Sequence, residues 1–229
     1  MRFKQPGISR LLVLVTGLFL QSPQAHAITA GQIDDFQDGT TQSWTGSPTT
    51  NASDSGPNGM GDHALSVPSS GGGGPGSRLV TFNNSSAWTG DWTANGVTQI
   101  QLDVFNPNAF EFTMRLGIAG PGDFGSFGQG NKYVTSTGIV VPTDSQWHTV
   151  LFDVTAADLA QISGTDAADA LTGVTQFRVI HNSASDWRGE AVAGTFLLDN
   201  ITAIPEPATA TLGLGSLAMA LLTRRERRH

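Results

Sequence analysis

Four aspartates stand near the two ends of the central part of the chain. Asp34, Asp35 and Asp38 lie in the segment IDDFQDG, and Asp199 lies in the segment LLDNI. Calcium binds about six to eight hard oxygen ligands, which carboxylates and backbone carbonyls supply. If the first and last strands of a sandwich lie side by side, these carboxylates meet, and we predict a structural Ca²⁺ site there. The alternative is that the acids are solvated at strand ends, with Asp38 in an Asp-Gly turn.

Aromatic side chains in polar, glycine-containing segments form a second group of candidates. Sugar rings stack on flat aromatic faces, while neighbouring polar groups fix the sugar hydroxyls. Trp92 in SSAWTGDWTANG and Trp187 in HNSASDWRGE, with Arg188 beside it, are the best candidates for a glycan site. The others are Trp88, Phe124 and Phe127. The alternative is that such rings fold back over the domain edge, while Trp44 and Trp147, which adjoin strands, are predicted to lie in the core.

Residue patterns typical of enzymes are scarce. The sequence has no cysteine, no Gly-x-Ser-x-Gly motif and no His-Glu-x-x-His motif. The histidines of the central region, His63, His148 and His181, are widely spaced, and no pair of acids has the setting expected for glycoside hydrolysis. We predict a non-catalytic protein and keep a glycoside hydrolase as the less favoured alternative.

The elements that must position these residues are short strands. Apolar and polar residues alternate over Val97–Phe105 and over Phe110–Ile118, and the intervening Asn106–Asn108 predicts a turn that joins them in a hairpin. Thr155–Ile162 begins with a variant of the capping box and predicts a short helix, whereas Thr45–Ser77 reads mainly as loop. Further strands are predicted at Ile33–Phe36, His63–Val67, Arg78–Phe82, Tyr133–Val141, Trp147–Val154, Val174–His181 and Thr195–Thr202. This pattern predicts an all-β, antiparallel β-sandwich that is jelly-roll-like.

Both ends of this region resemble the β-jelly-roll carbohydrate-binding modules. The segment DDFQDGT followed by Trp44 is similar to their opening Phe-Glu-Asp-Gly-Thr…Trp pattern, and Phe196–Ile201 is similar to their closing Ile-Asp-Asp-Ile strand. The strand that begins at Trp147 resembles an internal strand of the same modules. The resemblance implies a jelly roll, carbohydrate binding and a structural Ca²⁺ at the paired ends. Gln37 stands where these modules usually have Glu, which removes one anionic ligand.

The charge of the central region is strongly negative. Residues 28–204 hold five lysine and arginine residues against 17 aspartate and glutamate residues, a net charge of −12. This balance argues against nucleic acid or an anionic membrane as a partner and favours cations or neutral glycans. An exported domain without cysteine has no disulfide bonds, so its core must hold it together.

The N-terminus has the features of a secretory signal peptide. A basic start precedes the apolar run Leu11–Leu20, and Ala25-His26-Ala27 is a small-x-small cleavage site. We predict that residues 1–27 are removed and that residues 28–203 form the sandwich domain.

The C-terminal residues 204–229 have three parts in a fixed order. Pro205-Glu206-Pro207 comes first, an apolar run at 208–223 follows, and a basic end that includes Arg224 and Arg225 closes the chain. The apolar run would be about 24 Å long as a helix, which is shorter than the roughly 30 Å hydrocarbon core and predicts only transient membrane insertion. An ordinary C-terminal membrane anchor is the alternative.

This order of features resembles the PEP-CTERM sorting signal of exosortase-carrying Gram-negative bacteria. The resemblance implies recognition by an exosortase-type membrane protease, cleavage near Pro-Glu-Pro and delivery to the cell surface or the extracellular matrix. We therefore predict an exported, non-catalytic surface or matrix protein that associates with exopolysaccharide. The alternative is a dedicated carbohydrate-binding module with an aromatic-lined glycan site.

Overall fold

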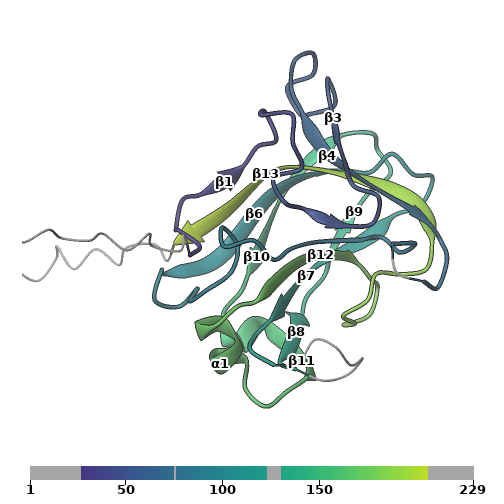
Figure 1. The fold of residues 1–229 in the computed structure, drawn as a ribbon. Coiled ribbons are helices and arrows are strands. Elements are labelled where there is room, and N and C mark those ends of the chain that lie inside the picture. The colour runs from purple at the N-terminus through teal and green to yellow at the C-terminus, as the bar shows by residue number, and fades with distance from the viewer. Residues whose placement is uncertain (1–26, 75, 123–129, 206–229) are drawn as a thin grey trace, which may run out of the picture.

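The computed structural model describes residues 27–74, 76–122 and 130–205 (Figure 1). These residues form two stacked antiparallel sheets, which confirms the predicted β-sandwich. In this part of the chain, sheet A has the order β10-β6-β13-β4-β3 with β1 beside β13, and sheet B has the order β11-β8-β7-β12-β5-β2 with β9 beside β7. Sheet A comprises β1 (Ile33–Asp34), β3 (Thr50–Ala52), β4 (Ala64–Ser70), β6 (Val97–Phe105), β10 (Trp147–Asp153) and β13 (Ala193–Pro205). Sheet B comprises β2 (Thr45–Gly46), β5 (Val80–Asn83), β7 (Phe112–Ala119), β8 (Lys132–Thr135), β9 (Ile139–Val141), β11 (Leu159–Ser163) and β12 (Gln176–His181).

The core lies between the two sheets and follows the alternation in the sequence. Successive side chains of a strand point to opposite faces, so every second residue of β6 and β7 is directed inward. These inward residues are Ile100, Leu102, Val104, Phe112, Met114, Leu116 and Ile118, and all are buried. One end of the core is aromatic, where the rings of Trp44, Trp88 and Trp92 lie 5.1–5.4 Å from that of Phe177.

The predicted hairpin between Val97–Phe105 and Phe110–Ile118 is wrong, although both strands exist. Strand β6 pairs with β10 and β13 in sheet A, whereas β7 pairs with β12, β8 and β9 in sheet B. The intervening segment is a corner between the sheets, and the buried Asn106 holds it by donating from Nδ2 to the carbonyls of Phe110 and Val141. Two amphipathic strands with a short connection can form a hairpin in one sheet or a corner between two sheets. Their alternation alone therefore did not decide between these arrangements.

Three other local predictions need correction. The helix predicted at Thr155–Ile162 is a single 3₁₀ turn at Ala156–Asp158, capped as expected by Thr155, after which the chain enters β11. The segment before β12, where no helix was predicted, holds the short helix α1 (Ala167–Thr172). Trp147 is only half-buried, because it lies on the outer face of sheet A against Phe105, with 5.7 Å between ring centroids.

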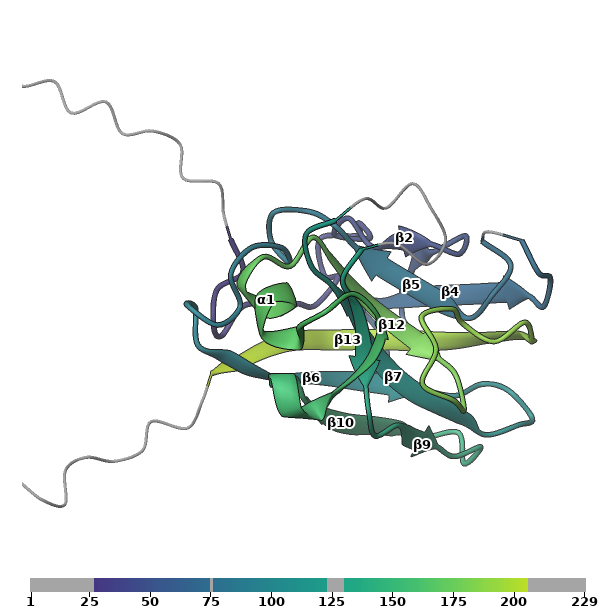
Figure 2. The same cartoon turned by 90° about the horizontal axis from the view of Figure 1, so that it is seen from below.

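The first and last strands of the domain pair, as the jelly-roll prediction required. Ile33 and Asp34 of β1 are opposite Thr202 and Ile201 of β13. Both described chain ends therefore lie at the same end of the sandwich (Figures 1 and 2). Strand β13 runs to Pro205, so the folded sheet reaches the first residue of the Pro-Glu-Pro motif.

Several predicted features lie outside the described residues. They are the signal peptide through residue 26, with Ala25, and the tail from residue 206, with Glu206, Pro207, Arg224 and Arg225. Within the described ranges, no helix has the length and apolar character needed to cross a membrane.

Candidate functional site

The outer face of sheet B carries an apolar layer that is separate from the core. The inward residues of β12 are Phe177 and Val179, so Arg178 and Ile180 point away from the core on the opposite face. Trp187, from the loop that follows β12, covers this layer. The other members are Ala119 and Val134, with Val80, Ala160 and Ile162 packed beside them. A sheet face that bears apolar side chains and is only partly covered provides a surface for a ligand.

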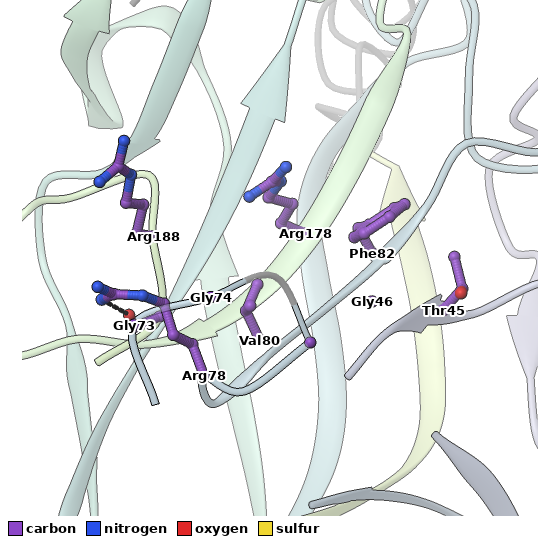
Figure 3. Close-up of a pocket in the computed structure, with 11 residues that line it drawn as sticks. Thr45, Gly46, Gly73, Gly74, Arg78, Val80, Phe82, Arg178 and Arg188 are labelled. Atoms are coloured by element: carbon purple, nitrogen blue, oxygen red, sulfur yellow. Dashed lines mark hydrogen bonds between the residues drawn. The ribbon is translucent and has the colours of Figure 1, made fainter. Parts of the chain in front are cut away.

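A pocket of about 410 Å³ opens on this face of the sheet (Figure 3). Strands β5 and β12 form its floor with Val80, Phe82 and Arg178, and β2 forms one side with Thr45 and Gly46. The segment between β4 and β5 contributes Arg78 and three glycines, and the loop after β12 contributes Arg188 and Gly189. Figure 3 shows the three arginine side chains and the Phe82 ring around this space.

The guanidinium group of Arg178 is held between two aromatic rings. Its Cζ lies 4.2 Å from the centroid of the Trp187 ring and 5.3 Å from that of Phe82. Arg178 Nε donates to Gln176 Oε1 at 2.7 Å, and Nη1 donates to the Trp187 carbonyl at 3.1 Å. Burial lowers the pKa of Arg178 to about 10, which leaves the group positively charged at neutral pH. Stacking and hydrogen bonding therefore fix a cation at the floor of the pocket.

A glycine in β7 makes the position of the Trp187 ring possible. A Cβ atom on Gly117 would lie 2.9 Å from Ile180 Cδ1 and 3.0 Å from Trp187 Cζ3, closer than real Cβ contacts. Trp187 therefore packs on the bare backbone of β7, and Arg178 packs on Trp187. The position of the arginine depends on a glycine in the neighbouring strand.

The loop that carries Trp187 and Arg188 is closed by hydrogen bonds at its base. Glu190 N donates to the His181 carbonyl at 2.8 Å, and Asn182 Nδ2 donates to the Arg188 carbonyl at 2.8 Å. Glu190 Oε1 accepts from both the backbone N–H and the hydroxyl of Ser183, and these bonds lower the pKa of Glu190. Arg78 Nη1 donates to the Gly189 carbonyl at 2.8 Å, so the loop and the opposite rim of the pocket are joined.

The sequence-predicted glycan residues have three different positions. Arg188 is exposed and lines the pocket. Trp187 lies beside the pocket but is 8% exposed, so its role is to support Arg178 rather than to present a free ring face. The expectation that Trp92 is an exposed loop aromatic is wrong: its ring is 0% exposed and its Nε1 donates to the carbonyl of Trp88, which is also buried. Phe124 and Phe127 lie outside the described residues.

Sequence reasoning missed Arg78, Arg178 and Phe82. Each belongs to, or directly precedes, a predicted strand, and Phe82 and Arg178 occupy positions opposite each other in the pairing of β5 with β12. Arg178 does stand on the polar side of the alternation in its strand, which was a signal that it points away from the core. The pairing of β5 with β12, which brings the two residues together, has no such signal in the sequence.

Asp34 and Asp38, two of the four acids of the calcium prediction, have hydrogen-bond partners within the protein. Asp34 Oδ2 accepts from the indole Nε1 of Trp44 at 2.7 Å and from that of Trp88 at 2.6 Å. Asp38 closes the expected Asp-Gly turn by accepting from the backbone N–H and the hydroxyl of Thr40, and these bonds lower its pKa. Burial raises the pKa of Asp34, because its carboxylate has left water.

Asp199 is the most buried of these acids, with 1% of its surface exposed. Burial, together with repulsion from Asp62, Asp103 and Asp35, raises its pKa to about 7, although the N–H of Asn200 donates to it. Gln37 stands at the position where the resembling modules have Glu. Its side-chain amide is neutral, so it adds no negative charge, and it donates to Asp62 Oδ1 at 2.6 Å.

Among the described residues, no group of three or more Asp, Glu, His or Cys side chains is placed to hold a metal ion. Asp34 accepts from the two indoles, and Asp38 accepts from Thr40 within its turn. The Ca²⁺ site at Asp34, Asp35, Asp38 and Asp199 therefore stays a prediction.

The pocket is equipped for binding rather than for acid–base chemistry. Its described lining supplies guanidinium donors, the Thr45 hydroxyl, the backbone of five glycines and the apolar surfaces of Val80 and Phe82. No carboxylate or imidazole is among these described lining residues. A pair of carboxylates flanking the scissile bond, as most glycoside hydrolases require, is thus not part of the described pocket.

Comparison with known proteins yields structural neighbours only. No family model matches the sequence, and no curated protein matches it. A family 11 carbohydrate-binding module from Clostridium thermocellum, in complex with a β-1,3-1,4-mixed-linked tetrasaccharide, is 16% identical with a TM-score of 0.49, and the match covers 78% of this chain and 97% of that one. The CBM22-1 xylan-binding domain of Paenibacillus barcinonensis Xyn10C is 14% identical with a TM-score of 0.46, and covers 79% and 100%.

A third neighbour extends the comparison to a much longer protein. An exo-β-agarase matches with a TM-score of 0.51 at 11% identity, over 78% of this chain but only 25% of the agarase. At this identity the match shows a shared fold and nothing about activity. The two carbohydrate-binding modules have TM-scores below 0.5.

Proposed function

We propose that this protein is a non-catalytic glycan-binding module whose site is the pocket on the outer face of sheet B. One observation carries the proposal: the half-buried Phe82 and the fixed Arg178, whose guanidinium lies over the Phe82 ring, line the floor of the same pocket. An apolar ring face with a few oriented polar groups is the usual composition of a small-ligand site, and 410 Å³ falls within the range of about 300–1,000 Å³ typical of such sites. Neighbours at 11–16% identity support the fold only.

The test is binding to a glycan array, followed by calorimetry with the purified full-length protein. We expect Phe82→Ala to weaken binding by about tenfold or more, because it removes the ring that faces the ligand. Phe105→Ala is the matched control, since Phe105 lies on the outer face of the opposite sheet, against Trp147. Binding that survives Phe82→Ala and is lost in Phe105→Ala would place the site on sheet A and refute the proposal.

We also propose that the module is exported and sorted by an exosortase-type protease to the cell surface or matrix of a Gram-negative bacterium, where it associates with exopolysaccharide. The order of Pro-Glu-Pro, apolar run and arginines supports this, as does the position of Pro205, the first residue of the motif, at the end of the last strand. Mass spectrometry of the mature protein should show a chain without residues 208–229. A mature protein that still ends at His229 would contradict sorting by cleavage.

A further inference from the structure

The basic residues of this acidic protein are concentrated on one face. Residues 28–204 carry only five lysine and arginine residues against 17 acids. Three of the five, Arg78, Arg178 and Arg188, line the pocket on sheet B. A fourth, Lys132 of β8, lies close enough that Arg178 and Arg188 help burial to lower its pKa. The fifth, Arg115 of β7, points to the same face of the sheet but is buried.

Arg78 and Arg178 are oriented by neutral acceptors among the described residues. Arg78 donates to the Gly189 carbonyl, and Arg178 donates to Gln176 and to the Trp187 carbonyl. Within the described part of the chain, neither Arg78 nor Arg178 forms a salt bridge. Their side chains are therefore fixed in space while their positive charges are not neutralised by an ion pair among these residues.

Arg115 shows what a structural arginine looks like in the same sheet. Its Nε, Nη1 and Nη2 donate to the backbone carbonyls of Asn182, Thr135, Ser136 and Ser183, so its guanidinium is surrounded by protein. Arg78 and Arg178 instead border a pocket of about 410 Å³. Among their described neighbours in the pocket lining there is no acidic side chain. The difference indicates that these cations face a ligand.

A planar guanidinium presents a fork of N–H donors that matches a carboxylate or a sulfate, with charge-assisted hydrogen bonds about twice as strong as neutral ones. A site that is partly removed from water strengthens this attraction. A neutral sugar would use the same donors less favourably. We propose that the pocket selects anionic glycans, meaning polysaccharides whose sugars carry carboxylate or sulfate groups, with Arg78 and Arg178 as the residues that bind the anionic group.

This inference rests on the proposed glycan-binding function and reverses one expectation from composition. The overall charge of −12 favoured neutral glycans, but overall charge does not describe the local field at a pocket. At physiological ionic strength, charges farther apart than about 8 Å are largely screened from each other when exposed. The acids of sheet A, on the other side of the sandwich, thus have little influence on a ligand that contacts the arginines directly.

The test uses the purified full-length protein and pairs of glycans that differ in charge alone. The carboxylate pair is polygalacturonate and its methyl ester, and the sulfate pair is dextran sulfate and dextran. Polyglutamate is the polyanion that is not a glycan. We expect the charged member of at least one pair to bind at least about tenfold more tightly than its neutral counterpart, and more tightly than polyglutamate. Which pair responds distinguishes a carboxylate ligand from a sulfate ligand.

Substitutions then assign the preference to the pocket. Arg78→Gln and Arg178→Gln should each weaken binding of the charged glycan by about ten- to a hundredfold. Arg178→Lys keeps the charge but loses the fork, and should recover only part of the affinity. Leu151→Glu is the matched control, because it also makes the net charge one unit more negative, on an exposed position of β10 in the opposite sheet. It should change affinity by less than about twofold.

Each other outcome overturns the inference in a distinguishable way. Equal binding of neutral and charged members leaves a glycan-binding module and removes the anionic preference. Absence of binding to every glycan, charged or neutral, removes the proposed function as well. If polyglutamate binds as tightly as the charged glycans, the protein attracts polyanions in general and does not select anionic glycans. A loss of affinity in Leu151→Glu as large as in Arg78→Gln shows that net charge, and not the pocket, decides.

Discussion

The carboxylate of Asp34 is the hydrogen-bond acceptor for two buried tryptophans, and its replacement tests how the two ends of the domain are held. Asp34 Oδ2 accepts from Trp44 Nε1 and Trp88 Nε1, and the two tryptophans are 1% and 0% exposed. Strand β1, which carries Asp34, is only two residues long and pairs with β13. The two indole bonds therefore attach a short edge strand to the aromatic end of the core.

Asp34→Ala should leave both indole N–H groups buried without an acceptor. An unsatisfied buried donor costs about 1–3 kcal/mol, so two donors give a loss of about 4 kcal/mol in the free energy of unfolding. In a domain of this size, each kcal/mol of lost stability lowers the Tm by about 2–4 °C. The loss of about 4 kcal/mol should therefore lower the Tm by about 8–16 °C. Asp34→Asn keeps an oxygen that can accept from both indoles and removes a charge that burial disfavours, so its loss should be within about 1 kcal/mol.

The assay is urea unfolding followed by tryptophan fluorescence, with Asp35→Ala as the neighbouring control. Among the hydrogen bonds of the described residues, the Asp35 carboxylate accepts only from the backbone N–H of Gln37, at 3.2 Å, and its removal should cost less than about 1 kcal/mol. If Asp34→Ala and Asp34→Asn destabilise equally, the negative charge matters rather than the acceptor, and the indole explanation is refuted. A loss below about 1 kcal/mol in Asp34→Ala would refute it as well.

Three further predictions concern burial, pH and metal. Trp92→Ala should destabilise the fold by about 3–5 kcal/mol in urea unfolding, because a fully buried ring is lost. If the variant lost glycan binding while its urea midpoint stayed unchanged, that result would contradict the burial of Trp92. Hydrogen bonds from Ser183 lower the pKa of Glu190 on folding from its ordinary value of 4.5. The ionised carboxylate should therefore stabilise the fold above about pH 4.5, and this contribution should decline as the pH falls further. In urea unfolding between about pH 5 and 3, Glu190→Gln should show a shallower decline, and an identical slope would argue against this contribution. If calcium binds beside Asp199, excess Ca²⁺ should raise the Tm relative to EDTA, and Asp199→Asn should abolish the difference; equal melting with Ca²⁺ and EDTA in the unmodified protein would exclude the site.

The strands were predictable wherever one face of a sheet is buried. Val97–Phe105 was predicted with the bounds that the structure has, because the strict alternation at its centre, Gln99–Val104, favours a strand. The pairing of the domain ends was also correct, since the segments that carry Asp34 and Asp199 resemble the opening and closing strands of a known sandwich. Short polar strands such as β2 and β3 were missed, because they lie in a segment whose glycine and serine content is that of a loop.

The exposure of aromatic residues could not be predicted from their local sequence. Trp92 lies in a polar segment and is fully buried, whereas Trp147 begins an amphipathic strand and is half-buried on an outer face. The local sequence decides which residues neighbour a ring along the chain, but burial depends on which distant elements pack over it. Phe177 of β12 packs against Trp92, and Phe105 of the adjacent strand β6 packs against Trp147.

The sequence by itself determined the all-β class, the acidic balance, the absence of disulfides and the features of the two chain ends, because all of these follow from composition and short-range pattern. Tertiary structure alone decided where the pocket lies. Arg78, Arg178 and Arg188 come from three separate segments, and only the pairing of β5 with β12 and the closed loop after β12 bring them together. Pairing between distant strands is fixed by the packing of the whole core, so a local cation site in an acidic chain appears only after folding.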